Sequence, residues 1–233
     1  MKYAISLAIG ILTGAAAFLG LLYYNPFLTT TTLSPLSVTD NQLMTLNYSA
    51  VAGDALIYTN DGDSLVNPHP EKVLQLWEAP IRRTAAFVTV LAEGRKQSAG
   101  IGIKFMSDSE QTRLLNGEAL VDSVWHIYLP GRGSLFIEQT ENYWSFLREI
   151  VVPAYWSKVN SWRGTWFGNV TVGPGALGTA RVVGGSGEFR TLESEAVESL
   201  SAKAYSVEQG PVAMDGQLNI EIPGDASGGG DGS

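Results

Sequence analysis

The sequence predicts a mainly β fold, an antiparallel β-barrel-like domain with one or two short helices, preceded by an N-terminal transmembrane helix. Runs of β-branched and aromatic residues alternate with glycine clusters, most clearly over 162–189, which is typical of strands and tight turns. A single long stretch, 143–155, follows helical spacing. The chain has 233 residues, enough for one sizeable core. We therefore expect a transmembrane anchor or signal peptide over 1–24, a tether over 25–37, the barrel-like domain over 38–222 and a disordered tail over 223–233.

The N-terminal segment, residues 3–24, contains no charged residue. At about 1.5 Å per residue, a helix of this length crosses a hydrocarbon core of about 30 Å. The small triplet Ala15–Ala17 offers a signal-peptidase site, but the apolar run continues beyond it and ends on Tyr23 and Tyr24, as interfacial anchors do. The pattern favours an uncleaved anchor over a signal peptide.

The charge next to this segment predicts its orientation. Lys2 and the free amino terminus are the nearby positive charges, so we expect a cytoplasmic N-terminus and a periplasmic or extracellular domain. Gly10 and Gly14 form a GxxxG pair, which is compatible with helix dimerisation, although small residues are common in such segments.

Composition excludes several function classes. The chain has no cysteine, so it can form neither a disulfide nor a thiolate metal site. Its net charge is −8, and nine acids against two bases place −7 of this in 184–233. An acidic region repels phosphate backbones, so we expect no nucleic-acid partner. A solvated acidic face that keeps the protein soluble is the simplest interpretation.

The first half of the domain reads as hairpins with a short helix between them. Strand-like runs over 43–51 and 55–59 predict one hairpin, and the apolar residues of 73–77 predict a short helix. The apolar run 85–92 and the alternating stretch 101–105 predict a central hairpin.

The second half begins with a short helix expected over 107–116, which has capping serines and a following glycine. Strands are expected over 123–129 and 134–139. The helix over 143–155 carries an aromatic stripe that packs on a sheet or, alternatively, is presented to a partner, and Pro153 should kink or end it.

The remaining strands follow the glycine-rich stretch. They are expected over 165–172, 179–183, 199–207 and 216–222. Between the second and third of these, Glu193, Glu195 and Glu198 read as a solvated connection.

The run A-R-V-V-G-G-S-G-E-F-R over 180–190 resembles the strand, glycine turn and aromatic residue of the dirigent and allene oxide cyclase family. The resemblance covers about forty residues and implies an eight-stranded antiparallel barrel. It also implies that Gly184, Gly185 and Gly187 form a tight turn and that Phe189 plugs one end of the barrel.

Candidate chemistry is confined to one predicted strand pair. His126, Glu138 and Arg132 lie on it with Asp122, and inside a barrel their pKa values could shift enough for acid–base catalysis. His126 shares a face with Val124 and Tyr128, so an inward orientation of that face would bring it into the barrel. A histidine satisfied by an ordinary hydrogen bond is the alternative.

These observations predict neither a cofactor nor a metal site. The two histidines, His69 and His126, lack metal-ligand spacing.

The first function hypothesis is a membrane-anchored, extracytoplasmic barrel that binds an apolar small molecule or a protein partner without chemistry of its own. A cofactor-free isomerase or cyclase, and an envelope assembly factor, are the alternatives. The aromatic ligand-binding candidates are Trp125, Tyr128, Trp162, Trp166 and Phe167.

Overall fold

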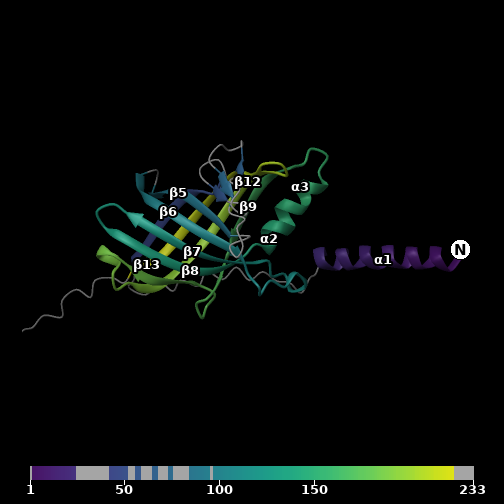
Figure 1. Cartoon of the computed structure of the whole chain (residues 1–233), viewed down its shortest axis with the longest axis horizontal. Helices are drawn as coiled ribbons and strands as arrows, with labels where there is room; N and C mark the ends of the chain where they lie inside the picture. The colour runs from purple at the N-terminus through teal and green to yellow at the C-terminus, as the bar shows by residue number, and fades with distance from the viewer. Residues whose placement is uncertain are drawn as a thin grey trace, which may run out of the picture.

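The body of the molecule is a closed antiparallel β-barrel, seen in a computed structural model (Figure 1). The structure describes residues 2–24, 42–51, 56–58, 65–67, 73–75, 84–94 and 97–222.

Eight strands form the ring, in the order β1-β13-β12-β11-β8-β7-β6-β5. Pairing of Leu46 with Glu93 returns β5 to β1 and closes it. The strands are β1 (Gln42–Ser49), β5 (Thr84–Glu93), β6 (Gln97–Asp108), β7 (Leu120–Leu129), β8 (Gly133–Asn142), β11 (Ala180–Gly185), β12 (Glu193–Ser206) and β13 (Gly210–Ile222).

Five further strands complete the sheet. One edge of β12 pairs first with β11 and then, from Ser199 to Ser206, with β9, while β10 pairs with the end of β8. β2, β4 and β3 extend the sheet from β5, and β2 and β4 are parallel. Their bounds are β2 (Leu56–Tyr58), β3 (Leu65–Asn67), β4 (Val73–Gln75), β9 (Ser161–Asn169) and β10 (Thr171–Gly173).

The two ends of the barrel differ. At one end, which we call the Phe189 end, β1 begins, β13 ends and a 3₁₀ turn, η4 (Gly187–Phe189), buries Phe189. Gly184 and Gly187 adopt positive φ there, and a Cβ at Gly185 would lie 1.8 Å from the Ser134 carbonyl oxygen. The predicted glycine turn and aromatic plug are therefore confirmed.

At the other end, which we call the helix end, β8 leads into one helical segment (Figure 1). The Trp144 amide donates to Asn142 Oδ1 at 3.0 Å as the segment begins. Ile150 and Ala154 are fully buried on its inner side, so the predicted packing against the sheet is confirmed. The segment consists of α2 (Trp144–Phe146), the π-helical η3 (Leu147–Val151) and α3 (Val152–Trp156), and it ends three residues after Pro153.

Large apolar side chains fill the barrel between the Phe189 end and its middle. Trp125 lies at the centre, and a Cβ on Gly102 would come within 2.8 Å of its ring. Strand alternation carries these side chains inward from every side of the ring. The fully buried set includes Leu46, Leu91, Trp125, Ile127, Leu135, Ile137, Phe189, Leu218 and Ile220.

Helix α1 (Lys2–Tyr24) is present as predicted, and its span Tyr3–Leu21 has a mean hydropathy of 2.1, long and apolar enough to cross a membrane. The central hairpin is confirmed as β5–β6, and the next pair as β7–β8. The helix expected over 107–116 is reduced to a 3₁₀ turn, η2 (Leu114–Asn116), which the left-handed Gly117 ends.

Three predictions are wrong. Residues 73–75 form strand β4 and no helix, because a short apolar run fits either period. β1 and β2 do not pair with each other, since each pairs with β5. Glu193–Glu198 is the first half of β12 and no connection. The predicted tether, the tail and His69 lie outside the described residues.

Candidate functional site

A cluster of polar side chains inside the barrel forms around Lys104. On β6 the alternation directs Gly102 and Lys104 inward and Ile103 and Phe105 outward. Lys104 is 2% exposed. Lysine is almost never this buried unless it is paired.

Two carboxylates hold the Lys104 ammonium. Its Nζ lies 2.8 Å from Glu141 Oε1 on β8 and 2.8 Å from Glu198 Oε1 on β12. It also lies 5.4 Å from the centre of the Trp125 ring. Both glutamates are completely buried. One cation therefore ties together strands β6, β8 and β12.

Glu198 accepts hydrogen bonds from several sides of the barrel. The Trp125 indole donates to Oε2 at 3.0 Å, and Tyr48 and Gln139 also donate to the carboxylate. The Glu198 backbone amide donates to Thr171 Oγ1 at 2.8 Å. Four strands besides its own thus fix this one side chain.

Glu141 lies nearer the helix end. It accepts hydrogen bonds from Ser123 and from Gln139 Nε2, the latter at 2.9 Å. The Tyr143 hydroxyl donates to Oε2 at 2.5 Å. We call the eight side chains that meet here the lysine cluster: Tyr48, Lys104, Ser123, Trp125, Gln139, Glu141, Tyr143 and Glu198.

The pKa values of the two carboxyls are shifted in opposite directions. Burial raises the pKa of Glu141, and the attraction of Lys104 does not fully offset it. Burial also opposes ionisation of Glu198, but Lys104 and the hydrogen bonds from Tyr48 and Trp125 bring its pKa below the ordinary value. Burial disfavours the charged form of Lys104, yet the two carboxylates leave its pKa raised.

The cluster contains one cation and two carboxyls, so full ionisation would leave a net charge of −1 in the core. Because its pKa is raised, Glu141 is the carboxyl that takes up a proton first. The Tyr143 hydroxyl then connects this acid to the helix end. The arrangement has the components of an acid–base group, a buried acid beside a lysine and a tyrosine.

Aromatic rings surround Tyr143 at the helix end, and we call Tyr143, Phe146, Trp166 and Tyr205 the aromatic wall. Phe146 is at its centre, with ring centroids 6.3 Å from Tyr143, 5.6 Å from Trp166 and 5.9 Å from Tyr205. Tyr143, Phe146 and Tyr205 are half-buried, so the wall has both a packed side and a surface that solvent reaches.

The five predicted ligand-binding aromatics do not form one wall. Trp125 and Trp166 point into the barrel, and Trp162 packs against the core near the helix end. Tyr128 and Phe167 point outward and are 53% and 67% exposed. Alternation explains the split, because Trp166 and Phe167 are adjacent on β9 and must face opposite sides.

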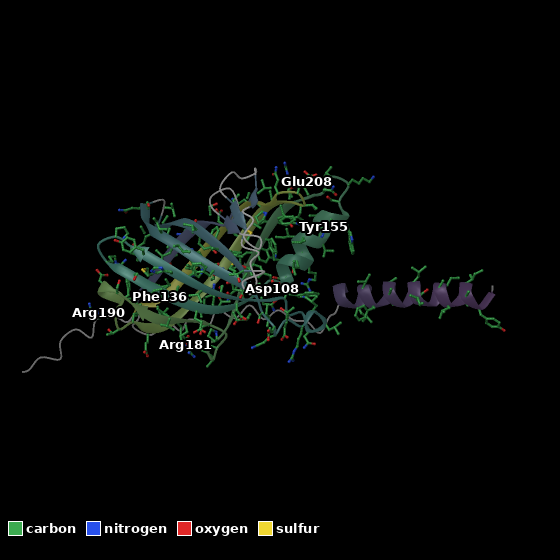
Figure 2. The ribbon with its side chains drawn as sticks, viewed as in Figure 1. Asp108, Phe136, Tyr155, Arg181, Arg190 and Glu208 are labelled. Atoms are coloured by element: carbon green, nitrogen blue, oxygen red, sulfur yellow. The ribbon has the colours of Figure 1, made fainter. Side chains whose placement is uncertain are left out.

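The expectation of an inward His126 is wrong. Trp125, Ile127 and Leu129 occupy the inner face of β7, so His126 lies outside, where its ring stacks on Phe136 at 4.6 Å. Figure 2 labels Phe136 on the wall of the barrel, and its side chain is 38% exposed.

Glu138 and Arg132 also lie away from the interior. Glu138 lines a shallow outer groove of about 250 Å³ with Asp122. Arg132, in the turn between β7 and β8, contacts Glu188 at 2.9 Å and Glu93 at 3.8 Å. The structure does not bring His126, Glu138 and Arg132 together in a barrel interior, and their catalytic role stays a prediction.

Lys104, Glu141 and Glu198 were not predicted from the sequence as site residues. One signal was available, since polar residues at alternate positions of β8, Gln139 and Glu141, continue the inner face begun by apolar residues of the same strand. Only the closed ring, however, shows that three such positions meet.

Comparisons with known proteins find similarity to this chain among solved structures. No protein-family model matches it, and no curated protein matches it. Among solved structures, it is similar to a pterocarpan synthase dirigent protein, with 11% sequence identity and a TM-score of 0.37 over 80% of this chain and 88% of that chain. These findings assign no function to the chain.

The opposite shifts predict opposite pH dependences for two variants. A raised pKa stabilises the fold below the ordinary value of 4.5, and this contribution is lost as the pH rises through the folded pKa. Wild type should therefore lose stability relative to Glu141→Gln as the pH rises above about 4.5. Relative to Glu198→Gln it should gain stability as the pH rises from the lowered pKa towards 4.5.

Chemical denaturation of all three chains between pH 3 and 8 measures both differences. Parallel slopes for the two variants would contradict the assignment of the proton to Glu141.

Proposed function

We propose that this chain is a membrane-anchored, extracytoplasmic barrel domain that binds an apolar small molecule at its helix end. The observation that carries the proposal is the aromatic wall, half-buried and set directly over the buried lysine cluster. Small-molecule sites are typically concave and mostly apolar, with a few fixed polar groups.

The position of the filled core supports the helix end as the site. Between the Phe189 end and Trp125, the described side chains fill the barrel, so a ligand has no room beside them. At the helix end, Phe146 and Tyr205 present ring surface, and the Tyr143 hydroxyl stands between this surface and Glu141. A ligand with an apolar body and one hydrogen-bonding group matches this arrangement.

Helix α1 supports the anchor. Its span Tyr3–Leu21 carries no charge, and nothing in the described structure buries any part of it. A charge-free helix of this length with Lys2 before it is expected to insert with its N-terminus in the cytoplasm.

A cofactor-free isomerase or cyclase is the second candidate, and the raised pKa of Glu141 favours it. A buried acid that holds its proton can protonate a bound ligand, and Lys104 stabilises the carboxylate that remains. In this version Glu141 and Tyr143 would do the work expected of His126 and Glu138, which lie outside the barrel.

Ligand binding should depend on the aromatic wall. Replacing Phe146 by alanine removes the ring at its centre, and burial of one such side chain contributes about 1.5–3 kcal/mol, so affinity should fall by about tenfold or more. The measurement is fluorescence titration with the uncharged probe N-phenyl-1-naphthylamine. It uses the domain cleaved from the folded full-length chain at a protease site introduced within 25–37.

The matched control is Phe167→Ala, which removes an exposed ring from the outer side of the same region and should leave affinity unchanged. Equal affinities for wild type and Phe146→Ala would contradict the proposed site. Glu141→Gln then separates the two candidates. A binder converts no ligand, either as wild type or as this variant. An isomerase converts its ligand as wild type, and the variant loses this conversion but retains binding.

The anchor predicts an intact N-terminus in the membrane. The full-length chain should stay in the membrane fraction after alkaline extraction, its mass should include residues 1–24, and external protease should digest the domain in spheroplasts. A soluble chain that begins just after Ala17 would show instead that the segment is a cleaved signal peptide.

A further inference from the structure

The hydrogen bond between Tyr143 and Glu141 can run in either direction. In the structure the Tyr143 hydroxyl donates to Glu141 Oε2 at 2.5 Å. A tyrosine hydroxyl both donates and accepts, whereas a carboxyl group donates only when it is protonated. The protonation state of Glu141 therefore decides whether the hydrogen of the Tyr143 hydroxyl is held by Glu141 or is released to another acceptor.

The surroundings of Glu141 favour a proton on this acid. Four described side chains that can carry charge lie around it: Lys104 on β6, Glu198 on β12, Tyr48 on β1 and Tyr143 after β8. Two carboxylates against one ammonium leave an excess negative charge in the core, and one proton removes it. Burial raises the pKa of Glu141 and the pKa of both tyrosines, so the tyrosines stay neutral while Glu141 takes the proton.

The donors around Glu141 select the oxygen that carries this proton. Ser123 and Gln139 Nε2 both donate to Oε1, so Oε1 stays an acceptor. Lys104 Nζ contacts both oxygens and distinguishes neither. Oε2 receives the Tyr143 hydroxyl, so a hydrogen on Oε2 can donate to the Tyr143 oxygen instead. The Tyr143 O–H is then free of Glu141.

The released O–H of Tyr143 lies among aromatic rings. In the described part of the chain, Glu141 is the hydrogen-bond partner of this hydroxyl. Tyr143 is half-buried, and its ring belongs to the aromatic wall. A hydroxyl in apolar surroundings needs an acceptor once its first partner is lost. A ligand that lies against the aromatic wall can supply that acceptor.

We propose that the helix end binds apolar ligands that carry a carbonyl oxygen, and that Tyr143 donates to this oxygen only while Glu141 is protonated. The inference rests on the proposed function, because it needs a ligand on the aromatic wall. A carbonyl oxygen accepts a hydrogen bond and has no hydrogen to donate, so it matches Tyr143 only when the hydroxyl is released. The proton on Glu141 comes from solvent, and no bond in the ligand changes. Binding of such a ligand is therefore linked to proton uptake and weakens as the pH rises and Glu141 ionises.

Two uncharged ligands that differ in one oxygen test the proposal. They are the ketone 2-acetylnaphthalene and 2-ethylnaphthalene, which has the same carbon skeleton without the oxygen. Each competes with N-phenyl-1-naphthylamine for the cleaved domain of the preceding section. The loss of probe fluorescence, measured between pH 4.5 and 8, gives the affinity of each ligand at each pH.

At pH 4.5, below the raised pKa of Glu141, the ketone should bind wild type about threefold to tenfold more tightly than the hydrocarbon, as one hydrogen bond provides. This preference should disappear as the pH rises, while the affinity of the hydrocarbon stays constant.

Three variants locate the effect. Tyr143→Phe keeps the ring and should remove the preference for the ketone at every pH. Glu141→Gln should keep the preference at every pH, because its amide always has a hydrogen to donate to Tyr143. The control is Tyr128→Phe, which removes a hydroxyl from the exposed outer side of β7 and should behave as wild type.

Equal affinities for the two ligands at pH 4.5, or a ketone preference in wild type that does not change with pH, would overturn this inference alone. A preference that survives in Tyr143→Phe would do the same. If Tyr143→Phe does not fold, a pH-dependent preference in Glu141→Gln is the contradicting result. Wild type that fails to bind N-phenyl-1-naphthylamine would overturn the proposed function and, with it, this inference.

Discussion

The Lys104 ammonium, enclosed by Glu141 and Glu198, is the interaction on which the interior of the barrel depends. These three residues come from strands that lie far apart in the sequence, and each carboxylate is further fixed by uncharged donors such as Trp125 and Gln139. Removing one partner from such a group leaves an uncompensated buried charge, so its geometry is all-or-none. This requirement selects one arrangement of the ring and gives the barrel a polar half towards the helix end.

The two halves of the barrel interior differ in composition. From the Phe189 end to Trp125, close apolar packing supplies stability and leaves no room for a ligand. Beyond Trp125, the lysine cluster supplies groups that can transfer a proton. The aromatic wall supplies apolar ring surface. Apolar side chains on the outer surface, including Ile101 and Tyr128, are exposed and lie outside this core.

Local pattern was sufficient to predict much of the fold. The hairpin around 93–97, the glycine turn at 184–187 and the helix after Asn142 all follow from residue spacing and turn chemistry. The site could not be found this way, because alternation shows which residues share a face and not which face is inside. Apolar residues such as Phe105 suggest the inner side of β6, yet the cluster turns Lys104 inward, and Glu198 looks like one more surface acid.

The most direct test of the account is the free energy of unfolding of full-length Lys104→Met, compared with wild type and with the triple variant that also carries Glu141→Gln and Glu198→Gln. We expect the single variant to lose about 3–5 kcal/mol, because two buried carboxyls lose their cation, and the triple variant to recover much of that loss. A single variant as stable as wild type, or a triple variant less stable than the single one, would contradict the central role of the lysine.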